Sequence, residues 1–130
     1  MNKWLSKLAK EMNNMVIELI RGDTSDIYKF QRINENGAIK TKAQKMWITF
    51  KRTPDCKEAL FQKTLEKGIS FSEEDYYYRF KLASEDTCNL LCGNYGFDIK
   101  IINENGDTKT LLNNGVLRLI TNYTHKENEV

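Results

Sequence analysis

Apolar and polar residues alternate in several short segments after residue 15, and this pattern constrains the fold more than any other feature of the chain. The alternation is clearest in segments 46–51, 76–82 and 95–101. Because successive side chains of a β-strand point to opposite faces, each segment predicts a strand with one face in the core and one wetter face. Three further segments predict strands: 27–33, 60–65 and 116–120.

The pentapeptide INENG occurs twice, at 33–37 and 102–106. Asn-Gly is a strong hairpin signal, because tight turns need positive φ angles that these two residues tolerate. The two copies are predicted to close two hairpins, one after segment 27–33 and one after segment 95–102. Their flanking residues differ, so we interpret the repeat as one turn used twice and not as a duplicated module.

Short strands separated by turns predict a single all-β domain over residues 16–123, with an immunoglobulin-like antiparallel β-sandwich as the architecture. A small barrel is the alternative. The segment around Tyr95 favours the sandwich, because LLCGNYGFDI (90–99) has the pattern of a tyrosine corner. In such a corner the tyrosine hydroxyl donates a hydrogen bond to the backbone a few residues upstream. Tyr95 is therefore predicted to be structural; an ordinary core tyrosine is the other interpretation.

Residues 1–15 have a different period from the rest of the chain. Trp4, Leu5, Leu8 and Met12 recur at three- and four-residue steps, which predicts an N-terminal amphipathic α-helix. We interpret this helix as an arm whose apolar face binds in the groove of a neighbouring protein. Packing on its own domain and lying on a membrane surface are the alternatives. At the other end, residues 124–130 are predicted to form a polar tail.

The distribution of charge argues against a nucleic-acid partner. Residues 1–15 carry the whole net charge of +2, so the remainder of the chain is neutral and lacks the basic footprint of phosphate binding. No apolar run approaches the roughly 18 residues of a membrane span, which predicts no membrane partner. Lysines also interrupt the apolar residues of the N-terminus, so no secretory signal is predicted and the protein is expected in the cytosol of its producer.

No group of residues predicts catalysis or metal binding. The carboxylates at 73–75 are interpreted as a solvated turn, and the Arg-Gly-Asp tripeptide at 21–23 as a structural turn. The acidic pair at 85–86 has no histidine, lysine or cysteine at a spacing that would complete an acid–base pair. The three cysteines lack CxxC spacing, and His125 is the only histidine. The sequence therefore predicts a protein that is not an enzyme and holds no cofactor or metal.

Two aromatic residues are predicted to point outward from the sheet. Trp47 and Tyr77 each fall between residues of the predicted core face. Both residue types anchor protein interfaces well, so the two are candidates for binding a partner. The alternative is that a loop or the N-terminal helix covers them.

The order of several short motifs resembles the N-terminal domain of phage baseplate upper proteins and related prophage tail proteins of Gram-positive hosts. The resemblance extends from about residue 16 to residue 120, and it depends on the order and spacing of the motifs. The motifs are IRGDT (20–24), NENG (34–37), MWITFK (46–51), ALFQKT (59–64), GISF (68–71), SEDT (84–87), GNYGFDI (93–99), NG (105–106) and TL (110–111).

The resemblance implies an immunoglobulin-like sandwich that is a non-catalytic virion component, made in the cytoplasm of the bacterial host. Its partners would be other virion proteins, with multiple copies in each particle. It also implies fold-keeping roles for four residues: Asp23, which would open the first strand, and Gly93, Tyr95 and Asp98, which would form the corner.

Full baseplate proteins continue into a further region, whereas this sequence shows only a short polar tail and an additional N-terminal helix. We therefore expect an adaptor that docks on the tail or baseplate. A capsid decoration protein of the head is one alternative. A small prophage-encoded protein that binds an intracellular host target is the other.

Overall fold

The computed structural model describes residues 15–121, which form β-strands and one short helix. The predicted helix over residues 1–15, with Trp4, Leu5, Leu8 and Met12, and the predicted tail lie essentially outside the described residues. The elements, in chain order, are β1 (Val16–Ile20), β2 (Tyr28–Phe30), β3 (Ile33–Asn34), β4 (Gly37–Ala38), β5 (Lys45–Lys51), β6 (Phe61–Leu65), β7 (Gly68–Phe71), β8 (Tyr78–Phe80), α2 (Ser84–Thr87), β9 (Gly93–Ile102) and β10 (Thr108–Ile120).

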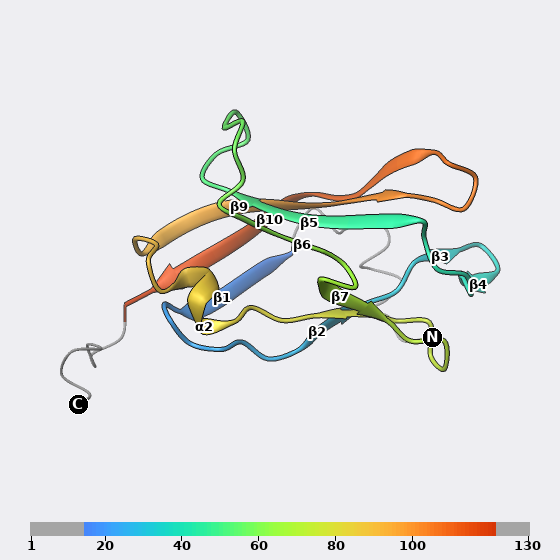
Figure 1. Cartoon of the computed structure of the whole chain (residues 1–130), viewed down its shortest axis with the longest axis horizontal. Coiled ribbons are helices and arrows are strands. Elements are labelled where there is room, and N and C mark those ends of the chain that lie inside the picture. Colours follow the sequence, from blue (N-terminus) through green and yellow to red (C-terminus); the bar gives the residue numbers. More distant parts are fainter. Residues whose placement is uncertain (1–14, 122–130) are drawn as a thin grey trace.

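Eight of the strands form one sheet in the order β1-β10-β9-β5-β6-β7-β8-β2, and β3 pairs with β4 in a separate hairpin. Figure 1 shows that the large sheet curls, so that β5, β9 and β10 lie in one layer and β2 and β7 lie across from them. The all-β prediction is confirmed. Two pairs, β1 with β10 and β6 with β7, are parallel, so the expectation of wholly antiparallel pairing is wrong for these two.

The sheet passes from one layer to the other at the β6–β7 connection. Glu66 has a φ of 70° there, and its amide donates to the Ile69 carbonyl oxygen at 2.7 Å. The neighbouring Gly68 has a φ of 112°, and a Cβ at this position would lie 2.7 Å from Lys63 Cδ. A side chain at 68 would be strained and crowded, so glycine is the residue that permits this sharp corner.

The strand faces follow the predicted alternation where the strands are longest. In β5, Met46, Ile48 and Phe50 are buried while the residues between them are half-buried, and β9 shows the same pattern. The Phe50 ring stacks on Phe61 at 4.4 Å and on Phe97 at 4.9 Å between centroids. Apolar residues from both layers thus fill one core.

The strand predicted at 76–82 is shorter than expected. Strand β8 covers Tyr78–Phe80 only, and Tyr76 has a φ of 65° in the preceding turn. The Tyr76 amide donates to the Ser72 carbonyl oxygen at 2.8 Å, and Asp75 Oδ1 accepts from the Tyr77 amide at 3.1 Å. These bonds keep the acidic turn at 73–75 intact as predicted, and they extend it into the first residues of the expected strand.

The last strand begins earlier than predicted. Residues 113–115 precede the segment that was predicted as this strand, 116–120, but they lie inside β10, where the pairing with β9 shifts register. A register shift of this kind is a β-bulge, which bends the strand without reversing the chain. The predicted start of the last strand, at residue 116, is therefore too late, because β9 continues to pair with β10 on both sides of the bulge.

Candidate functional site

The two INENG segments close the two hairpins predicted from them. The first joins β3 to β4, and the second joins β9 to β10. In each copy the first asparagine side chain accepts a hydrogen bond from the amide two residues on, at 2.8 Å for Asn34 and 3.0 Å for Asn103. Short Asx turns of this kind fix the hairpin geometry locally.

An ion pair connects the two hairpin regions, although they are far apart in sequence. Arg32 precedes the first INENG, and its guanidinium donates to both carboxylate oxygens of Glu104 in the second, at 3.1 and 2.9 Å. Arg32 also donates to the Thr41 carbonyl oxygen at 2.8 Å, and the Thr41 hydroxyl donates to Glu104. Bidentate pairing of this kind gives both orientation and strength.

Burial makes this ion pair important for stability. The Arg32 side chain is only 5% exposed and that of Glu104 is 33% exposed. Hydrogen bonds from Arg32 hold the pKa of Glu104 below its usual value. A buried guanidinium that lost its carboxylate would be left uncompensated, so the pair locks the relative position of the two hairpins.

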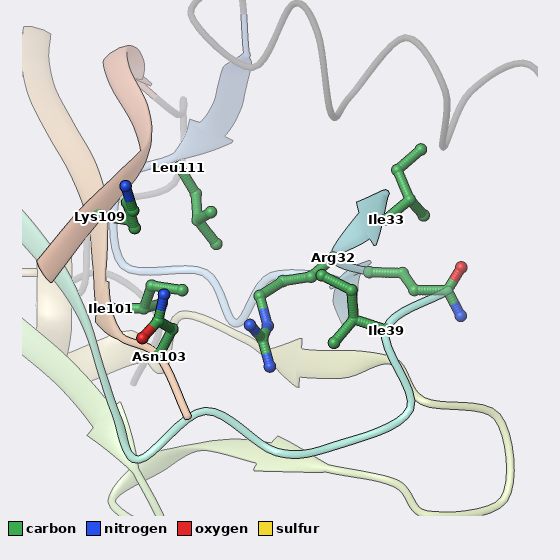
Figure 2. Close-up of a pocket in the computed structure, with 8 residues that line it drawn as sticks. Arg32, Ile33, Ile39, Ile101, Asn103, Lys109 and Leu111 are labelled. Carbon is green, nitrogen blue, oxygen red and sulfur yellow. The ribbon is translucent and has the colours of Figure 1, made fainter. Parts of the chain in front are cut away.

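A pocket of about 210 Å³ lies between the two hairpins (Figure 2). Its walls are mainly aliphatic, and polar groups come from Gln31, Arg32, Asn103 and Lys109. Lys109 is opposite Ile101 in the β9–β10 pairing, so it belongs to the core-facing side of the hairpin, at the open end between the layers. Among residues 15–121, Arg32 Nε is buried there without a hydrogen-bond partner. The pocket is large enough for a small aliphatic group.

A second region lies on the outward face of the β9–β5–β6 layer. Trp47 is half-buried and points away from the core, as predicted. It is directly opposite Lys100 on β9 and Thr64 on β6. Hollows of about 390 and 340 Å³ lie on its two sides, and Trp47 lines both of them. A large aromatic side chain between two hollows can act as the anchor of a protein interface.

Tyr77 does not belong to the Trp47 region. It precedes β8, which β6 and β7 separate from β5 in the sheet. Its ring lies beneath two cations of the same chain, with Lys29 Nζ at 4.8 Å and the Arg79 guanidinium at 5.7 Å from the centroid. The structure thus separates the two predicted partner-binding aromatics and gives Tyr77 intramolecular contacts.

The predicted tyrosine corner has its hydrogen bond. Tyr95 is buried, and its hydroxyl donates to the Leu91 carbonyl oxygen at 2.6 Å, four residues upstream. Gly93, with a φ of 143°, begins β9 in a conformation that favours glycine. Both residues therefore have the structural positions that were expected of them.

The other two predicted fold-keeping residues are placed differently. Asp23 was expected to open the first strand, but it follows β1, and its amide donates to the Ile20 carbonyl oxygen at 3.0 Å in the turn. Asp98 was expected in the corner, but it faces outward beside Trp47. Positions 95 and 98 differ by an odd number, so they lie on opposite faces of β9. Burial raises the pKa of Asp98, against the opposing effect of Lys100 and Lys51.

Replacing Tyr95 with phenylalanine tests the corner. We expect Tyr95→Phe to lower the free energy of unfolding by about 1 kcal/mol, because one part-buried hydrogen bond is lost while the ring stays. Urea unfolding monitored by circular dichroism measures this change. Tyr76→Phe, at a half-buried tyrosine outside the corner, is the control; an equal loss in both variants would contradict a special role for Tyr95.

The acidic clusters have structural roles. Asp75 pairs with Arg79 at 2.5 Å, and hydrogen bonds from Arg79 hold the pKa of Asp75 well below its usual range. Asp86, in α2, accepts from Lys63 Nζ and from the Ala83 amide, both at 2.7 Å. Among residues 15–121, no group of three or more His, Cys, Asp or Glu side chains could hold a metal ion. The same part of the chain contains no helix that is long and apolar enough to span a membrane.

Sequence reasoning missed both the Arg32–Glu104 pair and the lysines around Trp47. The pair joins positions separated by 72 residues, and nothing local to either residue indicates the other. Two of the lysines could have been predicted from the sequence. Lys45 and Lys51 are separated from Trp47 by an even number of residues in β5, so they lie on the same outward face.

Comparisons with known proteins do not assign the chain to a family. The sequence matches no protein-family model, and a search of curated proteins finds no significant match.

Proposed function

We propose that this protein is a non-enzymatic structural protein of a phage or phage-tail-like particle, an adaptor that docks on the tail or baseplate through protein–protein contacts. The observation that carries the proposal is the position of Trp47, half-buried on the outward face of β5 between two open hollows. Tryptophan is enriched among the residues that dominate binding free energy, especially where neighbouring groups can exclude water. This arrangement supports docking by a sheet face.

The placement in a particle is supported by the order of motifs, which resembles that of baseplate upper proteins. Within this proposal, the curled sheet is interpreted as an immunoglobulin-like sandwich, and the hydrogen bond from Tyr95 to the Leu91 carbonyl oxygen supports that interpretation. The partners would be other virion proteins, present with this chain in multiple copies. Trp4, Leu5, Leu8 and Met12 are proposed as a second, independent anchor.

The direct test is to search for the protein in particles induced from the producing strain. We expect blotting to detect the chain in purified particles, and immunogold labelling to place it at the tail tip or baseplate. Gold over the head would replace the tail assignment with capsid decoration. Particles free of the protein, alongside abundant protein in the cell, would overturn the structural role and direct attention to an intracellular target.

Replacing Trp47 tests the docking face. We expect Trp47→Thr, which keeps a good strand former, to fold normally and to reduce incorporation into particles roughly tenfold, equivalent to about 1.4 kcal/mol of binding free energy. Quantitative blotting of particles from a strain that carries the variant measures this. Ile27→Thr is the matched control, because Ile27 is 64% exposed and lies outside this face. Equal incorporation of the Trp47 variant and the control would contradict the proposal.

A further inference from the structure

Lysines surround Trp47 on both sides. The hollow toward the start of β5 is lined by three of them, and so is the hollow toward its end. Two carboxylates, Glu66 and Asp98, lie among them, so positive charge is in clear excess. The six lysines are Lys42, Lys45 and Lys67 around the first hollow and Lys51, Lys57 and Lys100 around the second.

The strand pairing explains why this charge gathers. Lys100 is directly opposite Trp47, and Lys45 and Lys51 are two and four residues away from it on the same face of β5. Lysines from two neighbouring strands, β5 and β9, thus form one surface around a single aromatic side chain. The whole domain is nearly neutral, so the excess is a local feature of this face.

The carboxylates on this face leave most of the lysines without a close ion pair. Glu66 pairs with Lys42 at 3.6 Å, but both side chains are largely exposed, so this pair is weak. Asp98 shares this face with Lys100, two residues along β9, and with Lys51, diagonally across on β5, so its single negative charge lies beside two lysines. Lys45, Lys51, Lys57, Lys67 and Lys100 have no salt bridge within 4.0 Å among residues 15–121.

We propose that the face around Trp47 binds an extended acidic segment of a protein partner, with one aromatic or aliphatic side chain packed on the indole and carboxylates reaching the lysines in the two hollows. This proposal rests on the docking role of Trp47 proposed above and names the chemistry of the partner. The two hollows lie on either side of one anchor along β5, so they suit a chain that runs along this strand. Charge complementarity then gives specificity and a faster association rate.

A protein segment fits this face better than a single-stranded nucleic acid. Nucleic-acid grooves commonly combine basic residues with several aromatic side chains that stack successive bases. Among residues 15–121, Trp47 is the single aromatic residue that lines the two hollows, and no arginine of this part of the chain lines either of them.

Fluorescence of Trp47 offers a direct test in the full-length chain. The protein has two tryptophans, so Trp4→Phe leaves Trp47 as the only reporter. Titration with a decaglutamate peptide that carries one leucine at its centre is expected to shift or quench this fluorescence, and rising salt should weaken the binding. Absence of a saturable change at low salt would overturn the proposal.

Paired lysine variants identify the surface. In the Trp4→Phe background, Lys51→Gln with Lys100→Gln is expected to raise the peptide Kd roughly tenfold. Lys81→Gln with Lys109→Gln removes the same charge elsewhere and should leave the Kd within about twofold. Equal losses in the two double variants would show that only net charge matters, and would overturn the assignment to this face.

Two further outcomes separate this inference from the proposed function. An oligonucleotide of equal formal charge is expected to bind more weakly than the peptide; tighter binding would overturn the acidic-protein assignment in favour of nucleic acid. If the Lys51/Lys100 double variant enters particles as well as the wild-type protein while Trp47→Thr does not, the docking role stands and the acidic-partner inference falls.

Discussion

Gly115→Ala is expected to lower the free energy of unfolding by about 3 kcal/mol, more than any other single methyl addition considered for this protein. A Cβ at position 115 would lie 2.6–2.7 Å from three ring atoms of Phe97. The Phe97 ring cannot move freely, because it stacks on Phe50 with 4.9 Å between centroids. The methyl group would therefore displace the aromatic stack at the centre of the core.

Chemical denaturation of Gly115→Ala measures this effect, and two variants sharpen it. Gly96→Ala is the matched control, because the nearest atom to its added Cβ is a carbonyl oxygen at 3.9 Å, an ordinary contact. We expect this control to change stability by less than about 1 kcal/mol. Phe97→Leu should recover part of the loss in a double variant. A Gly115 variant as stable as the wild-type protein would contradict the close packing of β10 on Phe97.

Glu104→Ala is expected to destabilise the protein by about 2 kcal/mol, since it leaves the buried guanidinium of Arg32 without its carboxylate. The estimate is below that for a fully buried pair, because Glu104 is one-third exposed and solvent partly screens it. Glu35→Ala is the control at the equivalent position of the first INENG segment. Glu35 is exposed and makes no ion pair among residues 15–121, so its loss should change stability by less than about 0.5 kcal/mol.

The effect of Glu104 should depend on pH in a defined direction. Hydrogen bonds from Arg32 lower the pKa of Glu104 below 4.5, its ordinary value, so folding favours the ionised carboxylate. Its contribution is complete above that ordinary pKa and disappears as the pH falls through the lowered pKa of the folded state. The stability difference between the wild-type protein and Glu104→Ala should therefore be constant near neutral pH and shrink in acid. A difference that grows in acid would contradict the assigned ion pair.

Redesign of the pair separates its energetic contribution from its positioning role. Arg32→Met combined with Glu104→Leu replaces two charges with apolar side chains, and such replacements of buried pairs are often neutral or stabilising. We expect the double variant to be more stable than Glu104→Ala. If the double variant is less stable than Glu104→Ala, then the hydrogen bond from Arg32 to the Thr41 carbonyl oxygen contributes more free energy than burial of an unpaired charge costs.

The sequence by itself determined the local features of this protein. The alternation of apolar and polar residues predicted the buried residues of β5 and β9, because successive side chains of a strand point to opposite faces of the sheet. The INENG segments predicted both hairpins, because Asn and Gly tolerate the backbone angles of a turn. The hydrogen bond of Tyr95 spans four residues, so its pattern also lies within a short stretch of sequence. The same alternation correctly predicted that Trp47 lies on the outward face of β5.

Tertiary structure alone decided how these local pieces combine. Pairing with β9 extended the last strand from the predicted 116–120 back to Thr108, through a bulge at 113–115, because this pairing satisfies a long run of backbone hydrogen bonds. The curl of the sheet separated Tyr77 from Trp47, and the side-by-side placement of β9 and β5 brought Lys100 to Trp47. The Arg32–Glu104 pair likewise depends on two hairpins that meet only in the folded chain. Contacts between distant segments are set by the packing of the whole core, which no local pattern encodes.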